Sequence, residues 1–136
     1  MERMTKHKLG KSDGSGSDMP CASTDTTYSR SLNIPYAKTF CLSVRAKVSA
    51  GTPDVDLYLE QTHVENAAEG AAGDATSGWA QAEGAAKILD ITDQNWHHLT
   101  VSPLALPKLR LKGVGQGTNP ASCTLEAYLT QIEPIV

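Results

Sequence analysis

The chain has 136 residues, of which 40% are hydrophobic and 20% are charged, and its net charge is −3. This length suits a single domain with its own hydrophobic core. No apolar run reaches the ~18 residues that a membrane-spanning helix needs, so a membrane partner is not expected. The first 18 residues lack the apolar centre of a signal peptide, so we do not expect secretion by that route.

The charge is distributed unevenly along the chain. Residues 1–11 carry a net charge of +3, which leaves −6 on the other 125 residues. The cations of this segment are Arg3, Lys6, Lys8 and Lys11. Residues 12–18 have the composition of a flexible linker, and residues 19–27 show no clear period. We therefore expect residues 1–27 to form an extended N-terminal arm outside a packed domain at 28–136.

Two functions are open for this arm. A basic segment beside an acidic body suits contact with an anionic partner surface, and it equally suits a solvated tail. The segment has no aromatic residue between its cations, so a nucleic-acid partner is not expected.

Alternating apolar and polar residues predict strands in the first half of the body. A weak alternation begins at Tyr28, and a strong one runs from Phe40 to Val48. A second strong run covers 55–60, after a Gly/Pro turn, so the two strong runs are expected to form a β-hairpin. Residues 61–78 are rich in Ala, Gly and acidic residues and predict a long loop with a functional role.

The second half of the body shows the same alternation. Short strands are expected at 86–91 and 96–101, and the second places Trp96, His98 and Thr100 on one side. The stretch 106–132 holds two further alternating runs, joined by a loop with two glycines and an Asn-Pro pair. We expect these two runs to form a second hairpin.

These strands predict an all-β fold, an antiparallel two-sheet sandwich of jelly-roll type with an extended N-terminal arm. The apolar side of each run should be buried between the sheets. The expected core residues are Phe40, Leu42, Val44, Val48, Val55, Leu57, Leu59, Leu109, Leu111, Leu125 and Leu129.

No group of residues has the spacing of a catalytic or metal centre, so we expect no enzyme activity, no cofactor and no metal. His97 and His98 are adjacent and face opposite sides of a strand, and His63 lies on a distant loop. Asp54 and Asp56, with Glu60 further along, would suit calcium, but a solvated polar strand face is the simpler interpretation. A cupin-like enzyme would need converging histidines, which this pattern does not offer. Three cysteines fit no zinc motif and are expected to be free thiols: Cys21, Cys41 and Cys123.

A saccharide-binding module is an alternative that the aromatic residues leave open. Exposure of Trp79, Trp96 or Tyr58 in a row on one face would indicate a sugar-stacking surface. The more common role of two tryptophans in a sandwich is to anchor a core or an interface.

The stretch from Leu32 to Glu133 resembles the jelly-roll cement or decoration proteins of tailed-bacteriophage capsids. The residues that carry this resemblance are 55–61 (VDLYLEQ), Trp79, 107–111 (PKLRL), 115–120 and 124–129 (TLEAYL). The resemblance implies a structural virion protein without an active site.

Such a protein would be made in the host cytoplasm, bind the outer capsid surface and stabilise contacts between subunits of the major capsid protein. It would also associate with copies of itself, as a trimer rather than a dimer. The residues expected to contact partners are Arg3, Lys6, Lys8, Lys11 and Trp79.

Overall fold

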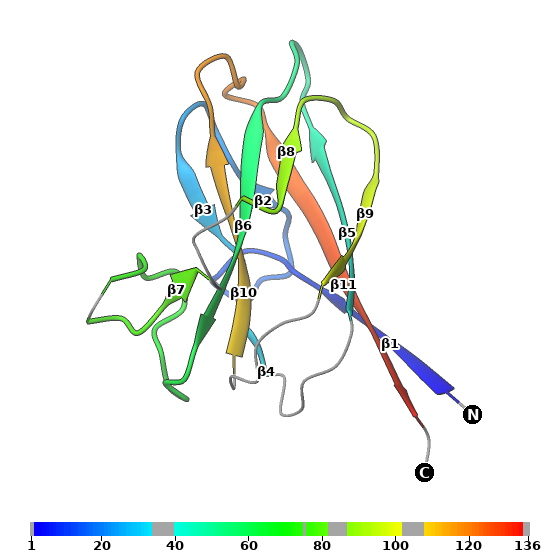
Figure 1. The fold of residues 1–136 in the computed structure, drawn as a ribbon. Helices are drawn as coiled ribbons and strands as arrows, with labels where there is room; N and C mark the ends of the chain where they lie inside the picture. Colours follow the sequence, from blue (N-terminus) through cyan, green and yellow to red (C-terminus); the bar gives the residue numbers. More distant parts are fainter. Residues whose placement is uncertain (1, 34–39, 75, 82–86, 102–107, 135–136) are drawn as a thin grey trace.

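The computed structural model describes residues 2–33, 40–74, 76–81, 87–101 and 108–134. These residues form eleven strands and no helix, arranged as two antiparallel sheets (Figure 1). The predicted all-β sandwich of jelly-roll type is therefore confirmed. Within the described ranges, nothing has the length and apolar character of a membrane-crossing helix.

The first sheet has five strands. Its order is β1 (Glu2–Lys8), β11 (Thr124–Pro134), β5 (Phe40–Lys47) and β9 (His97–Val101), and β2 (Met19–Pro20) also pairs with β11. The second sheet has six strands. Its order is β3 (Thr26–Tyr28), β10 (Lys108–Gly115), β6 (Val55–Thr62) and β7 (Ala80–Gln81), with β4 (Leu32–Asn33) on β10 and β8 (Leu89–Ile91) on β6.

The apolar side of each alternating run faces the space between the sheets. In β5, burial alternates without a break from Phe40 to Lys47, because successive side chains on a strand point to opposite faces. Ten of the eleven expected core residues are buried, and Val48 is partly buried against the same cluster. The sequence pattern thus identified the inward faces correctly.

The two expected hairpins are wrong. β5 and β6 lie in different sheets, and so do β10 and β11. β10 pairs with β6, with Leu111 opposite Leu59, while β11 pairs with β5, with Leu125 opposite Ala46. Alternation shows which side of a strand faces the core. It does not show pairing, because two strands can both turn their apolar sides to the core from one sheet or from two facing sheets. The connecting loops span the ~10 Å between the sheets.

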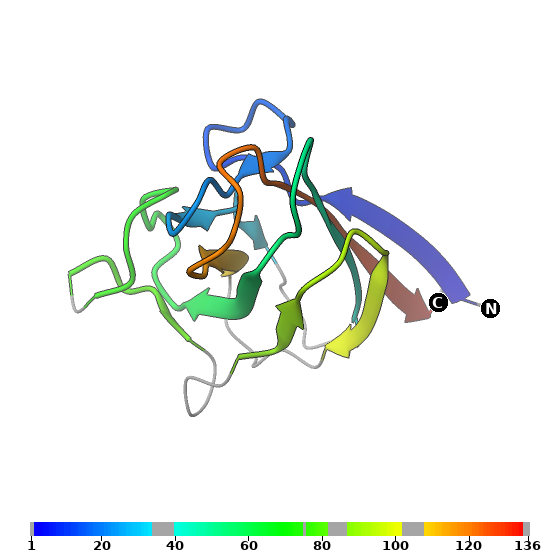
Figure 2. The ribbon, with the colours of Figure 1, turned by 90° about the horizontal axis from the view of Figure 1, so that it is seen from above.

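The expectation that residues 1–27 lie outside the packed body is also wrong. Leu9, Met19 and Cys21 belong to the core cluster, each no more than 1% exposed. β1 pairs with β11 along its whole length, from Glu2 opposite Pro134 to Lys8 opposite Tyr128. Figure 2 shows β1 (dark blue) lying along β11 (red). Isolated apolar residues in a polar segment gave no period from which this burial could be predicted.

The loop after β10 holds the N-terminal segment in place. The buried Asn119 side chain donates hydrogen bonds to the carbonyls of Cys21 (2.7 Å) and Ser23 (2.9 Å), and accepts one from the Asp54 amide (3.0 Å). A Cβ at Gly115 would lie 1.8 Å from the Ser23 carbonyl oxygen, so only glycine permits this approach. The predicted turn residues therefore join three distant segments.

Candidate functional site

The outer face of the five-stranded sheet carries side chains in regular rows, since paired residues on neighbouring strands share a face. One row runs from β9 to β1 through His98, Ser43, Tyr128 and Lys8. The next row contains Thr100, Cys41, Thr130 and Lys6. Four strands at ~4.8 Å spacing give this face a width of about 14 Å.

Three aromatic side chains meet on this face, and we call Trp96, His98 and Tyr128 the aromatic platform. The Trp96 and His98 rings are stacked, with centroids 6.4 Å apart and planes 13° apart. The Tyr128 ring lies 6.1 Å from Trp96 at a tilt of 40°. Trp96 is 39% exposed, so the platform offers aromatic ring surface to solvent.

A shallow hollow of about 290 Å³ lies over the platform. It is lined by Lys6, Ser43, Trp96, His98, Tyr128 and Thr130. The Ser43 hydroxyl is 2.7 Å from Nδ1 of His98, which fixes the imidazole beside the tryptophan. The hollow thus combines aromatic rings with hydroxyl and ammonium groups, the mixture typical of small-ligand sites.

Ion pairs border the platform. Arg45 donates from Nε and Nη2 to Oε1 of Glu126, both at 2.9 Å, and its guanidinium lies 4.9 Å from the Trp96 ring centroid. Lys47 contacts Asp18 at 2.5 Å and Glu126 at 3.5 Å, and Lys8 contacts Asp18 at 3.1 Å. These contacts hold the polar border of the platform in a fixed arrangement.

The same contacts shift pKa values. The hydrogen bond from the Tyr128 hydroxyl lowers the pKa of Glu126, with help from Arg45 and Lys47, and it raises the pKa of Tyr128. Burial acts to raise the pKa of Asp18, but hydrogen bonds from Lys47 and Lys8 outweigh it, so the net shift is downward. The hydrogen bond with Asp18 raises the pKa of Lys47. These shifts keep Asp18, Glu126 and Lys47 ionised at neutral pH and keep Tyr128 protonated.

The outer face of the six-stranded sheet is built differently, because the loop after β6, described at 63–74 and 76–79, folds over part of it. Arg110 of β10 points to this face but is fully buried, with its guanidinium 4.0 Å from the Tyr28 ring and 4.2 Å from the Trp79 ring. Its Nη2 donates to Glu60 (2.6 Å) and to the Ala71 carbonyl (2.5 Å). The Trp79 indole, 1% exposed, donates to the Ala68 carbonyl at 3.2 Å. Arg110 and Trp79 therefore fasten the loop to the sheet.

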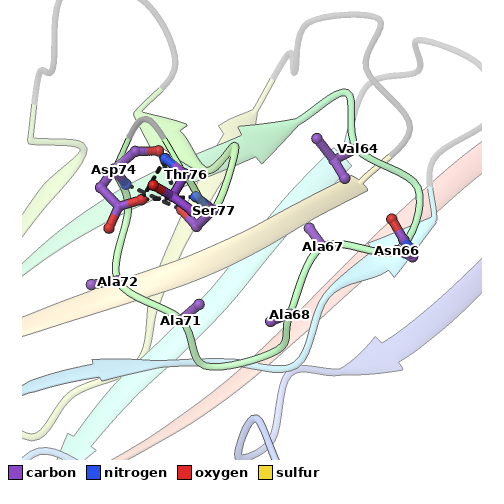
Figure 3. A pocket seen from close by; sticks show the side chains of 9 residues that line it. All are labelled: Val64, Asn66, Ala67, Ala68, Ala71, Ala72, Asp74, Thr76 and Ser77. Carbon is purple, nitrogen blue, oxygen red and sulfur yellow. Dashed lines mark hydrogen bonds between the residues drawn. The ribbon is translucent and has the colours of Figure 1, made fainter.

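The loop itself encloses a depression of about 410 Å³, shown in Figure 3. Alanine supplies four of its nine lining residues. Its one carboxylate, Asp74, accepts hydrogen bonds through Oδ1 from the amides of Thr76 (2.8 Å) and Ser77 (2.7 Å). These bonds lower the pKa of Asp74. The polar groups of Asp74, Thr76 and Ser77 form hydrogen bonds with one another, and few remain to orient a ligand.

Three carboxylates approach one another at the start of β6. Ligand oxygens of Asp54, Asp56 and Asp90 lie within 4.8 Å of one another. The Lys87 ammonium contacts Asp56 (3.3 Å) and Asp90 (3.7 Å), so a cation of the chain already neutralises part of this charge. Glu60, the third residue of the sequence pattern, is paired with Arg110 instead. His97 and His98 point to opposite faces, as the sequence indicated, and His97 contacts Asp93 at 2.9 Å.

The predicted contact residues are not gathered in one place. Lys6 and Lys8 lie on the outer face of β1. Lys11 forms an isolated backbone β-bridge with Ser29, and its ammonium lies 3.6 Å from the Asp13 carboxylate. Arg3 lies in β1, but its side chain is outside the described residues. Trp79 is buried, so it has no surface to offer a partner. A row of Trp79, Trp96 and Tyr58 does not exist, because Tyr58 and Trp79 belong to the opposite sheet from Trp96.

Tyr128, Ser43 and Thr130 are the site residues that sequence reasoning missed. The strand pattern placed Trp96 and His98 on one side, but only the register of β9, β5 and β11 brings Tyr128 beside them. The three cysteines are free, as expected, with Cys21 and Cys123 buried.

No family model matches the chain, and no curated protein matches it. Among solved structures, the chain is similar to the SPBc2 prophage-derived protein YomS, at 12% identity over 98% of this chain and 96% of that one, with a TM-score of 0.47. It is also similar to the K1 cleaved adhesin domain of Lys-gingipain from Porphyromonas gingivalis W83, at 11% identity over 98% and 99% of the two chains, with a TM-score of 0.49.

A third similar structure is the carbohydrate-binding module CBM36 in complex with calcium and xylotriose, at 14% identity over 95% and 99% of the two chains, with a TM-score of 0.40. All three TM-scores lie below 0.5, so function has to be inferred from the chain's own residues.

Proposed function

We propose that the chain is a non-catalytic binding module that holds a saccharide on the aromatic platform. The observation that carries this proposal is the exposed Trp96 ring, stacked on His98 and flanked by Tyr128 on an otherwise polar sheet face. Sugar rings have apolar C–H faces that pack on aromatic rings, and hydroxyl groups at their edges that need hydrogen-bond partners. Ser43, Thr130 and Lys6 supply such partners around the hollow.

The test is binding of the purified chain to a panel of immobilised oligosaccharides, followed by calorimetry on those retained. Trp96→Ala and Tyr128→Ala should each weaken binding by about tenfold or more, the effect of losing a central aromatic contact. Tyr58→Ala, a matched change on the opposite sheet, should bind like the wild type. The proposal fails if no saccharide is retained, or if Trp96→Ala and Tyr58→Ala bind equally well.

A second candidate function is that of a structural virion protein on the outer surface of a phage capsid, with the major capsid protein and copies of itself as partners. The supporting observation is β1, which in the described sheet pairs on one side only and carries Met4 at 70% exposure. An edge strand offers unpaired backbone groups to which another chain can add a strand. A trimer remains the expected self-associated form.

This candidate is tested by sedimentation of the pure chain and by its binding to capsids stripped of decoration. We expect a trimer that saturates the capsids, and Met4→Glu should lower the occupancy while leaving the fold intact. A monomer with no affinity for capsids would contradict this candidate and leave the saccharide proposal unaffected.

A further inference from the structure

We propose that the aromatic platform selects saccharides with an anionic substituent, a uronic acid carboxylate or a sulfate ester, and that Lys6 binds this group. The inference rests on the proposed saccharide-binding function and adds the class of ligand. The inference depends on Lys6, because this lysine differs from the other cations around the platform in its contacts with carboxylates.

The other cations around the platform already contact carboxylates. Lys8 contacts Asp18, Lys47 contacts Asp18 and Glu126, and Arg45 contacts Glu126. Lys6 has no carboxylate contact among the described residues, and its Nζ lies 5.0 Å from the centroid of the Tyr128 ring. An ammonium group over an aromatic face keeps its charge and its three donors for a ligand.

Lys6 also has the right position. It lines the hollow together with Trp96 and Tyr128, and it pairs in register with Thr130, which lines the hollow too. A sugar ring seated in the hollow against Trp96 therefore has its substituents beside the ammonium. A contact of opposite charges next to apolar rings is stronger than the same contact in bulk water.

The charge balance of this face agrees with an anionic ligand. Four lysine and arginine side chains border the platform, against the two carboxylates of Asp18 and Glu126. These six groups, all from the described part of the chain, sum to +2 around the platform, although the whole chain carries −3. A local positive surface on an acidic protein attracts anions to that place rather than to the whole molecule.

The experiment is calorimetry of the full chain with three probes: a galacturonic acid tetramer, the fully methyl-esterified form of the same tetramer, and a sulfated neutral tetrasaccharide. The first two probes have the same sugar backbone and differ in whether the carboxyl groups are free anions or neutral esters. The variants are Lys6→Gln and, as the matched control, Lys112→Gln, whose lysine lies 5.4 Å from the Tyr58 ring on the opposite sheet.

We expect the wild type to bind the acidic tetramer about tenfold more tightly than its ester, and Lys6→Gln to remove this difference, since one charge-assisted contact accounts for about a factor of ten. The Lys112→Gln variant should keep it. Comparison of the two anionic probes shows whether carboxylate or sulfate is preferred, and tight binding of either supports the inference.

Equal affinity of the wild type for the acidic tetramer, its ester and the sulfated probe would overturn the role of Lys6, while the saccharide-binding function would stand. An anion preference that survives in Lys6→Gln would also overturn it. Absence of binding to all three probes and to the oligosaccharide panel would overturn both proposals.

Discussion

Arg110 and Glu60 form an ion pair to which solvent has almost no access, with Nε and Nη2 of the arginine 2.9 Å and 2.6 Å from Oε1 of the glutamate. The pair joins β10 to β6, where the two residues are direct cross-strand partners. The rings of Tyr28 and Trp79 enclose the guanidinium. A sheet face that usually meets water is thereby closed by the loop that follows β6.

Replacement of Arg110 should destabilise the folded protein. Arg110→Ala leaves the Glu60 carboxylate buried without its partner, and we expect the free energy of unfolding to fall by about 3–5 kcal/mol. Lys112→Ala, two residues along the same face, should change it by less than ~1 kcal/mol. Urea denaturation of both variants measures the difference. Equal values for the two would mean that the loop holds its position without the pair.

Truncation of the N-terminus should separate two roles of the first residues. Deletion of 1–27 removes Leu9 and Met19 from the core, at ~2–5 kcal/mol for each large buried side chain, which approaches the ~5–15 kcal/mol total stability of a domain. We therefore expect this truncated chain to lose cooperative unfolding. Deletion of 1–7 removes most of edge strand β1 alone, and should leave a folded protein with a lower Tm. Thermal melts followed by circular dichroism provide the measurement, and a near-normal Tm for the longer deletion would refute the burial of this segment.

Stability should fall in acid because of the carboxylates around the platform. The pKa values of Asp18 and Glu126 are lowered in the folded protein, so the unfolded chain binds protons first as the pH falls. Their contribution is complete above the unfolded values of about 4 and is lost as the pH falls through the lowered folded values. The Tm should therefore be flat near neutral pH and drop below about pH 4, and Asp18→Asn should reduce that drop. An unchanged acid profile in Asp18→Asn would show that these ion pairs add nothing to stability.

The cysteines should differ in reactivity. Burial raises the pKa of the Cys21 thiol to about 12 and also raises that of Cys123, and a thiol must lose its proton to act as a nucleophile. Cys41, on the outer face of β5, is only partly buried. We expect a disulfide reagent at pH 8 to modify Cys41 alone in the native protein and all three thiols in denaturant. Native modification of Cys21, detected by mass spectrometry of peptides, would contradict the packed position of residues 19–21.

The inward faces of the strands could be predicted from the sequence, because successive side chains point to opposite faces. A strand with one buried face therefore needs an apolar residue at every second position. Leu42 and Leu111 lie where that period places them. The pairing of strands could not be predicted in this way. Either a hairpin or two facing sheets buries the same leucines, and the choice depends on loop geometry at residues such as Asn119, whose three hydrogen bonds reach segments far away in the chain.

The site was harder to predict than the core. Trp96 was one of three aromatic residues considered for a sugar-stacking row. Its partner Tyr128 is 32 positions further along and reaches it only through the register of β11 on β5. Lys6 was predicted to lie in an extended arm outside the packed domain, whereas its position in β1 places it over the Tyr128 ring. The charge of a lysine does not show in which strand the residue will lie.

The position of β11 in the sheet also affects how the chain can fold during translation. Tyr128 pairs with Ser43 on one side and with Lys8 on the other, so the central strand of the five-stranded sheet is the last of its strands to be synthesised. During translation β1, β2 and β5 are made before β11, the strand with which all three pair. Topologies dominated by such distant pairings fold in milliseconds to seconds rather than microseconds. The apolar side of β5 stays uncovered by β11 for that interval, so the growing chain is most prone to aggregation just before residues 124–134 leave the ribosome.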